Sequence, residues 1–224
     1  MTEPAEPVPD RQVESARRAM VEGQLMPMGV TDRLVLEAFR QVPRERFVPP
    51  GRRLLAHVDA PQPIGAGRSM MAPLPLGLLL EKARPRPGER ALVVGAGTGY
   101  SAALLARIGC RATALEEEPV LAEAARARTG DAVQVVCGPL TAGWPAGAPF
   151  DLILIDGSIA FVPEALVGQL REGGRLAAVV RGQDGVDRPS LGRFLAGILH
   201  LEPLAEAAAP PLPGFQRAPT FEFA

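Results

Sequence analysis

The chain has 224 residues, of which 47% are hydrophobic and 22% are charged, and its formal net charge is −1 at pH 7. This length is suited to one α/β domain with a sizeable core. The balanced charge argues against a nucleic-acid partner, because nucleic-acid binders usually carry a basic face. No apolar run approaches the roughly eighteen residues of a membrane helix, which argues against a membrane partner.

The chain begins with an acidic, proline-rich stretch, MTEPAEPVPD, that lacks the apolar segment of a secretory signal. We therefore expect a disordered tail over residues 1–12 and a cytoplasmic protein. Residues 13–41 have apolar residues at helical spacing, interrupted by Pro27 and Gly29. This pattern predicts two helices joined by a turn, with Thr31 as the N-cap of the second helix.

A proline- and glycine-rich stretch follows over residues 42–73. Long irregular loops ahead of a main domain are more often functional than accidental. We find no repeat and no interdomain linker, so we expect a single domain over residues 13–224. Its first part, residues 13–73, is predicted to be a helical N-terminal extension with a loop on the substrate side.

A regular alternation of helices and apolar strands begins at residue 74. The predicted elements are helices over 74–83, 100–109, 119–130 and 162–174, and strands over 91–94, 111–117, 132–138, 150–157 and 175–180. Continuous apolar strands between helices indicate a mostly parallel, doubly wound sheet, here a Rossmann-like core over residues 74–182. The remainder, 183–224, is expected to add edge strands over 194–208 and 219–223.

The two cysteines, Cys110 and Cys137, lie on separate apolar runs, and we expect both to be buried free thiols. The two histidines, His57 and His200, lack ligand-like spacing to each other or to a cysteine. We therefore expect no metal site.

The first core strand leads into the glycine loop of ALVVGAGTGY, residues 91–100. A phosphate-binding P-loop would require Lys-Ser/Thr after its glycines, and the dinucleotide fingerprint is GxGxxG. Gly95, Gly97 and Gly99 instead form GxGxG, the pattern typical of S-adenosylmethionine-dependent methyltransferases of the Rossmann-like class I fold. Glycines there let the backbone approach a ligand closely, and helix N-terminal amides can meet its carboxylate.

An acidic residue at the end of the next strand should accompany such a loop, because it can accept hydrogen bonds from ribose hydroxyls. Glu116 lies at that position. We therefore expect S-adenosylmethionine as cofactor, with S-adenosylhomocysteine as its product. Its predicted ligands besides the three glycines and Glu116 are Ala96, Tyr100 and Gly138.

Over roughly residues 20–180 the sequence resembles the protein-L-isoaspartate O-methyltransferases. The resemblance is carried by MVEGQLMPMGV, VPRERFVP, DAPQPIGAGRSMMAP, VVGAGTGYSAALLA, and GWPAGAPFDLILI with VPEALVGQLREGGRL. It implies methylation of the stray α-carboxylate of isoaspartyl residues in damaged proteins, which starts their repair. It also implies an isoaspartyl protein or peptide as partner, and we expect a monomer or a homodimer.

Three positions depart from the family pattern. Met71 stands where the family has a serine at the reaction centre, Val93 replaces a glutamate before the glycine loop, and Pro139 replaces the aspartate of an adenine-side G-D-G. Arg68 and Ser69 occupy the places of a glutamine and a threonine in the same loop. An arginine is a natural carboxylate partner, so we expect Arg68 and Ser69 to face the substrate carboxylate beside Met71.

Two alternatives stay open. Asp156, at the predicted carboxyl end of the fourth strand, could act as a base for a hydroxyl or amine acceptor, which would make the chain a methyltransferase with another substrate. The loss of three polar contacts at Met71, Val93 and Pro139 instead favours a catalytically degenerate member that binds a partner protein. Cofactor binding distinguishes the degenerate member from both enzymes.

Overall fold

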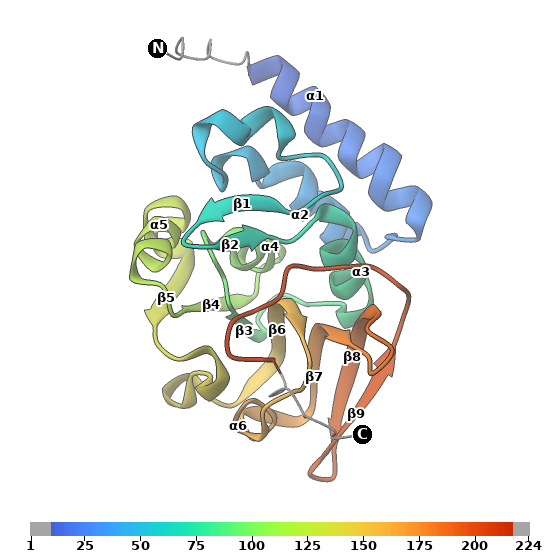
Figure 1. The fold of residues 1–224 in the computed structure, drawn as a ribbon, viewed down its shortest axis with the longest axis vertical. Coiled ribbons are helices and arrows are strands. Elements are labelled where there is room, and N and C mark those ends of the chain that lie inside the picture. Colours follow the sequence, from blue (N-terminus) through green and yellow to red (C-terminus); the bar gives the residue numbers. More distant parts are fainter. Residues whose placement is uncertain (1–9, 217–224) are drawn as a thin grey trace, which may run out of the picture.

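The computed structural model describes residues 10–216 (Figure 1). Its helices are α1 (Asp10–Met20), α2 (Arg33–Gln41), α3 (Pro73–Ala83), α4 (Tyr100–Ile108), α5 (Pro119–Thr129) and α6 (Glu164–Val167). Its strands are β1 (Gln62–Gly65), β2 (Arg68–Met70), β3 (Arg90–Val94), β4 (Arg111–Glu116), β5 (Val133–Cys137), β6 (Phe150–Ile159), β7 (Leu170–Arg181), β8 (Asp187–Leu195) and β9 (Ile198–Pro203).

The main sheet has seven strands in the order β5-β4-β3-β6-β7-β8-β9. Strands β3 to β7 pair in parallel, and β8 and β9 add an antiparallel edge. This confirms the mostly parallel Rossmann-like fold. The order reverses at β3, which pairs with β4 on one side and β6 on the other. Open α/β sheets bind ligands in the crevice at such a point.

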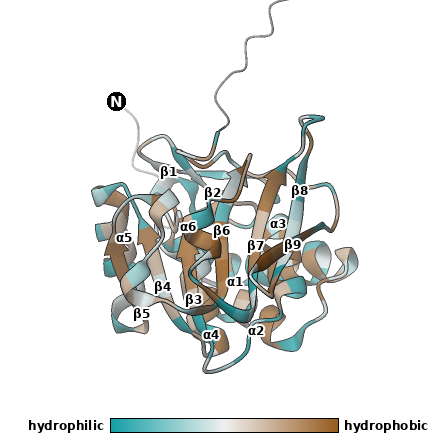
Figure 2. Ribbon diagram, turned by 90° about the horizontal axis from the view of Figure 1, so that it is seen from below, coloured by the Kyte–Doolittle hydropathy of each residue, from teal (hydrophilic) through white to brown (hydrophobic). Residues whose placement is uncertain are grey.

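Alternate residues of the central strands face two hydrophobic cores, as the period of two in a strand requires. In β3, Ala91 and Val93 join the core beneath α2, α3 and α4, whereas Leu92 and Val94 join the core on the opposite face. Figure 2 shows hydrophobic residues concentrated in these inner strands. Because both faces are covered, the strands carry apolar residues almost without interruption, and the sequence pattern could reveal them.

The N-terminal extension contains the two predicted helices, but Thr31 does not cap the second one. Asp32 is the N-cap of α2, and its side chain accepts hydrogen bonds from the backbone of Leu34 and Val35. The Thr31 hydroxyl donates instead to the buried carboxylate of Glu81 in α3, 3.0 Å away. The two residues are adjacent, so sequence alone could not choose between them.

Other local predictions are corrected. The tail was expected to reach residue 12, yet α1 begins at Asp10. The helix expected over 162–174 is only the four residues of α6, because β7 already begins at Leu170. Cys110 is buried as expected, but Cys137 is exposed at the end of the edge strand β5. The strand expected over 194–208 is found as the end of β8 and β9, and the one over 219–223 lies outside the described residues.

Two irregular segments meet above the glycine loop. The proline- and glycine-rich stretch contains the small antiparallel hairpin β1–β2, which the sequence pattern did not reveal. From the opposite end of the chain, residues 204–216, here called the strap, run back over the sheet beside β6 (Figure 1). The backbone of Ser158 accepts from Leu212 at 2.9 Å and donates to Pro210 at 2.7 Å. These bonds hold the strap at the carboxyl edge of the sheet.

Among the described residues, no helix is long and apolar enough to cross a membrane. The same part of the chain holds no group of three or more histidine, cysteine, aspartate or glutamate side chains that could bind a metal ion.

Candidate functional site

The glycine loop connects β3 to α4 at the reversal of the strand order. Gly95, Gly97 and Gly99 all have positive φ, at 76°, 55° and 97°, a region that residues with a Cβ rarely adopt. Two backbone amides of the loop, those of Gly95 and Ala96, donate to the Leu115 carbonyl of β4. The predicted loop is therefore present, and it is anchored to the neighbouring strand.

The acidic residue predicted for the end of the next strand lies directly beside this loop. Glu116 ends β4 and is fully buried. Its carboxylate accepts hydrogen bonds from the backbone of Gly97 at 2.7 Å, Glu117 at 3.0 Å and Glu118 at 3.2 Å. The structure thus brings together the two parts of the cofactor site that the sequence predicted.

Arg68 occupies the space next to this carboxylate. Its side chain leaves β2 of the hairpin and is 5% exposed, and one guanidinium nitrogen lies 2.9 Å from a Glu116 oxygen. The other terminal nitrogen donates to the Gly95 carbonyl at 3.0 Å. In this conformation Arg68 is directed into the crevice over the glycine loop, bound to protein groups on both sides.

Two apolar side chains close the remaining space over the loop. A Cβ placed on Gly95 would lie 2.5 Å from Cδ1 of Leu212 in the strap. A Cβ placed on Gly97 would lie 2.6 Å from Cδ1 of Ile64 in β1. The glycines are therefore required twice, by their backbone conformation and by close contact with the residues that cover them.

A second group of buried polar side chains lies between β6 and α4. The Ser101 hydroxyl donates to Asp156, whose other carboxylate oxygen has no hydrogen-bond partner among the described residues. Burial raises the pKa of Asp156 to about 6, against the opposing effects of the Ser101 hydrogen bond and of the nearby charges of Arg68 and Arg44. Asp156 can therefore exchange a proton near neutral pH.

Arg44 is the functional-site candidate that the sequence analysis missed. It lies in a short helical turn after α2 and is completely buried, donating to the Ala56 carbonyl at 2.6 Å and to the Met71 carbonyl at 2.5 Å. Its guanidinium carbon is 4.8 Å from the centre of the Tyr100 ring, a cation–π contact. Arginine is rarely buried without a carboxylate, so no residue pattern could have predicted this placement.

The remaining predicted residues lie around these two groups. Tyr100 begins α4 and packs against Phe39 and Phe47, and burial raises its pKa to about 12 although the Arg44 charge opposes this shift. Met71 is 1% exposed and belongs to the apolar core. Ser69 is half-buried in β2.

The structure also locates the three other positions that the sequence analysis named. Val93 is buried in β3, within the core beneath α4. Gly138 follows β5 and donates to the Glu116 carbonyl at 3.1 Å, and Pro139 beside it is exposed. The substituted residues are thus compatible with the fold.

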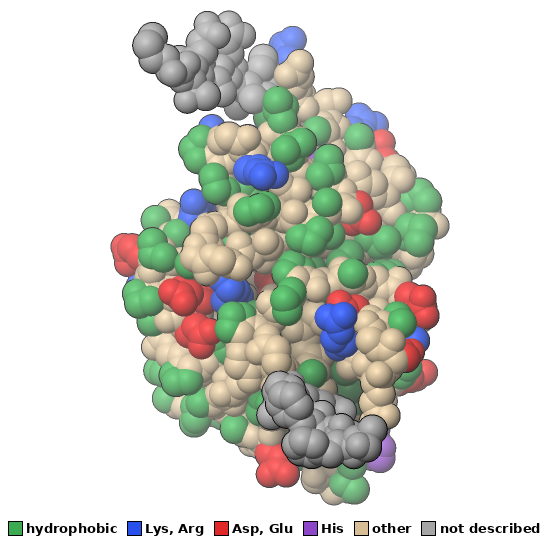
Figure 3. Space-filling model, viewed as in Figure 1, with side chains coloured by type: hydrophobic (Ala, Val, Ile, Leu, Met, Phe, Trp, Pro, Cys, Tyr) green, Lys and Arg blue, Asp and Glu red, His purple; other side chains and the backbone are tan. Residues whose placement is uncertain are grey.

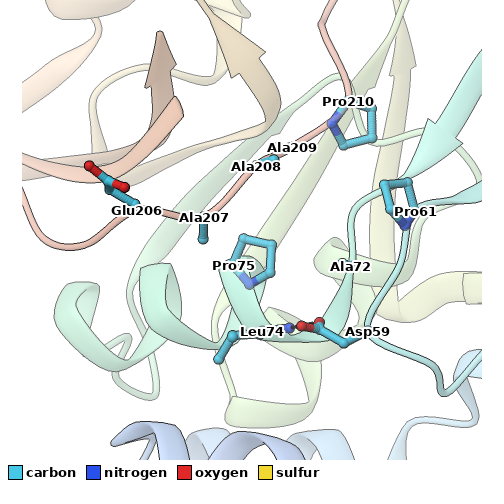
Figure 4. A pocket seen from close by; sticks show the side chains of 10 residues that line it. All are labelled: Asp59, Pro61, Ala72, Leu74, Pro75, Glu206, Ala207, Ala208, Ala209 and Pro210. Atoms are coloured by element: carbon cyan, nitrogen blue, oxygen red, sulfur yellow. Dashed lines mark hydrogen bonds between the residues drawn. The ribbon is translucent and has the colours of Figure 1, made fainter. Parts of the chain in front are cut away.

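A pocket of about 430 Å³ opens between the hairpin side and the strap (Figure 4). Asp59 and Glu206 supply its carboxylates, and Pro61, Pro75 and Pro210 supply much of its apolar wall. The Asp59 carboxylate is fixed by the backbone amide of Leu74 at 2.9 Å. Over the surrounding surface, acidic and basic side chains are interspersed (Figure 3). The pocket reaches Ala72, the residue after Met71.

Comparison with known proteins gives a consistent result. The sequence profile of the protein-L-isoaspartate(D-aspartate) O-methyltransferase family matches residues 16–187. A protein-L-isoaspartate O-methyltransferase of Methylorubrum extorquens (strain PA1) is 48% identical over 179 residues, covering 79% of this chain and 78% of that protein. The protein of the same name from Methylorubrum populi is 48% identical over 170 residues, covering 75% and 80%.

Solved structures agree with this result. One of a protein-L-isoaspartate O-methyltransferase has a TM-score of 0.76 at 25% identity and covers 88% of this chain and 66% of that one. A Plasmodium falciparum structure described as a protein of this kind, in complex with S-adenosyl-L-homocysteine, has a TM-score of 0.74 at 21% identity and covers 88% and 97%, which supports the fold. The chain belongs to the protein-L-isoaspartate(D-aspartate) O-methyltransferase family.

Proposed function

We propose that this chain is an S-adenosylmethionine-dependent carboxyl methyltransferase that acts on isoaspartyl residues of damaged proteins. The observation that carries the proposal is the glycine loop with Glu116 beside it, at the reversal of the strand order, in a chain of this family. Class I methyltransferases need both parts in this place. The expected cytoplasmic location and the monomeric or dimeric state stay predictions.

The reaction makes modest chemical demands on the protein. An ionised carboxylate is already a nucleophile, and S-adenosylmethionine supplies an activated methyl group when it is bound. The protein has to align the carboxylate and exclude water. Arg68 and Ser69 are the side chains proposed to receive the acceptor carboxylate. The pocket that reaches Ala72 is the proposed approach for the peptide.

The residues that would hold the cofactor are present, but this conformation does not fit it. Glu116 is the proposed acceptor for ribose hydroxyls, yet the Arg68 guanidinium holds one of its oxygens, and its side chain is completely buried. Leu212 and Ile64 fill the space over the loop. Cofactor binding therefore requires Arg68 and these apolar side chains to move.

Methyl transfer to matched peptides tests the proposal. The protein is incubated with methyl-labelled S-adenosylmethionine and either an isoaspartyl peptide or the same sequence with ordinary aspartate. We expect base-labile label in the isoaspartyl peptide alone. Glu116→Gln should abolish it by weakening the cofactor site, whereas Glu123→Gln, on the exposed face of α5, should not. Cofactor binding without transfer to either peptide would contradict this acceptor.

Asp156 favours a second candidate, a methyltransferase with a hydroxyl or amine acceptor. Its free carboxylate oxygen and its pKa of about 6 suit a general base near neutral pH. In that case Asp156→Asn would abolish transfer to the true acceptor while leaving cofactor affinity unchanged. Isoaspartyl methylation that survives Asp156→Asn would count against this candidate.

The closed crevice favours the third hypothesis, a member of the family that binds a partner protein and catalyses nothing. The contacts of Arg68 and Leu212 over the glycine loop are those of a filled site. Calorimetric titration with S-adenosylhomocysteine tests it directly. Binding in the micromolar range by the unmodified protein would exclude this hypothesis.

A further inference from the structure

We propose that Arg68 sets the cofactor affinity of this chain, because its guanidinium takes the position beside Glu116 that the cofactor ribose has to occupy. Ribose hydroxyls and the guanidinium are then alternative partners of one carboxylate. The inference rests on the proposed function only in taking the family cofactor as the ligand, and it holds whatever the methyl acceptor is.

The contacts of Arg68 are those of an internal occupant of the site. The guanidinium joins the Glu116 carboxylate to the Gly95 carbonyl, and these two groups lie at the carboxyl ends of the neighbouring strands β4 and β3. Neither group of the pair is accessible, with side chains 5% and 0% exposed. A ligand that donates to the Glu116 oxygen held by Arg68 has to displace this guanidinium first.

The arrangement also allows Arg68 to leave without exposing an unsatisfied carboxylate. Glu116 keeps its three bonds from the backbone amides of Gly97, Glu117 and Glu118 when the arginine is absent. Arg68 itself lies on a strand of three residues, at the end of a hairpin whose turn contains Ala66 and Gly67 at positive φ. The site can thus exist with the arginine in or out.

The sequence points to the same residue. The resembled family has an uncharged, shorter glutamine where this chain has Arg68. Glutamine lacks the second and third donor groups of the guanidinium and cannot form an ion pair with Glu116. The departure at Arg68 is therefore tied by a direct contact to the cofactor-site acid, which the departures at Val93 and Pro139 are not.

Titration calorimetry of the full chain with S-adenosylhomocysteine and S-adenosylmethionine tests the inference. We expect Arg68→Gln to bind both about tenfold or more tightly than the unmodified protein, because the competing charged hydrogen bonds are gone. Arg68→Lys, which keeps the charge but has no fork to reach Gly95, should lie between them. Arg175→Gln is the matched control: it removes a comparable ion pair, with Glu89 at 2.7 Å, and should bind as the unmodified protein does.

The outcomes separate the inference from the proposed function. Tighter binding by Arg68→Gln, together with no isoaspartyl methylation by the unmodified protein, would retain the inference and argue against the isoaspartyl acceptor. Isoaspartyl methylation by both proteins at equal cofactor affinity would retain the function and overturn the inference. Weaker binding by Arg68→Gln would also overturn it, showing that the arginine holds the cofactor. Should Arg68→Gln fail to fold, the ranking of Arg68→Lys against the unmodified protein decides.

Discussion

The molecule buries two arginines at the same edge of its sheet, and they are held in different ways. Arg44 donates to two backbone carbonyls and stacks on Tyr100, and it makes no carboxylate ion pair within residues 10–216. Arg68 pairs with Glu116, a carboxylate that three backbone amides also bind. Asp156 experiences the charge of both.

This difference separates an arginine that connects two segments of the fold, here called a brace, from one that the fold can replace, here called a replaceable partner. Without Arg44, the carbonyls of Ala56 and Met71 would lose their buried donor, and two segments of the extension would lose their connection. Without Arg68, the Gly95 carbonyl would lose one donor, but the Glu116 carboxylate would keep three backbone amide donors. Burial alone therefore does not show which of the two charges the fold depends on. What shows it is how many hydrogen-bond donors the acceptor groups keep when the arginine is removed.

The largest expected effect is that of Arg44→Met. It removes two charge-assisted hydrogen bonds and the contact with Tyr100, so we expect a loss of about 3–5 kcal/mol in the free energy of unfolding. Urea unfolding followed by circular dichroism measures it. Arg52→Met, which changes an exposed arginine, should stay within about 0.5 kcal/mol. A loss below about 1 kcal/mol at Arg44 would show that it is no brace.

The next effect depends on pH and concerns Asp156, between the two arginines. Its pKa is raised from 3.8 to about 6, so between these values the folded state binds more protons than the unfolded state. The contribution of Asp156 to the unfolding free energy should therefore fall by about 3 kcal/mol as pH rises from about 4 to about 6, and then level off. Asp156→Asn should lack this slope.

Urea midpoints across that pH range check the prediction. The exposed carboxylate of Asp131 supplies the control, since Asp131→Asn should keep the slope of the unmodified protein. Parallel curves for the unmodified protein and Asp156→Asn would contradict the assignment.

A smaller loss of stability is expected when a Cβ is added to Gly95, in the crevice beneath Arg68. Gly95→Ala places a Cβ 2.5 Å from Leu212 at a φ of 76°, and we expect it to lower stability by about 2 kcal/mol. Gly67→Ala has a similar φ of 69° but nothing within 4 Å, so it isolates the backbone contribution. In a double-mutant cycle, Leu212→Ala should relieve the excess at Gly95. Additive losses of stability for Gly95→Ala and Leu212→Ala would mean that the added Cβ does not clash with Leu212 of the strap.

The smallest expected effect on stability is that of Arg68→Gln. Glu116 retains its amide donors, so we expect a loss of about 1.5 kcal/mol, which matches the roughly tenfold gain in cofactor affinity expected from the same variant. Urea unfolding beside Arg44→Met under the same conditions makes the comparison direct. Equal losses for the two variants would remove the distinction between brace and replaceable partner.

The sequence predicted the core of this fold well because its strands are buried on both faces. The apolar runs of β3, β4 and β6 need no tertiary knowledge to be recognised. The glycine loop and Glu116 could also be predicted, since their spacing is set by one strand–loop–helix–strand unit. The prediction of a helix over 162–174 failed because part of that segment belongs to β7 instead. Short apolar runs have no distinctive period that would tell a strand from a helix.

The polar interior could not be predicted. The partners of Arg44 and Arg68 lie 12 to 48 positions away in the chain. Such contacts depend on how the hairpin and the extension fold over the sheet, which local patterns do not encode. The same holds for Leu212, whose contact with Gly95 joins the strap to the first core loop.

The strap also has a consequence for synthesis. Its contacts with Ser158 and Gly95 join segments far apart in sequence, and such contacts form late in folding because long loops must close first. A chain growing from its N-terminus therefore exposes the glycine loop to the cell before its cover has been made. A small molecule bound in that interval would meet a crevice that Leu212 does not yet cover.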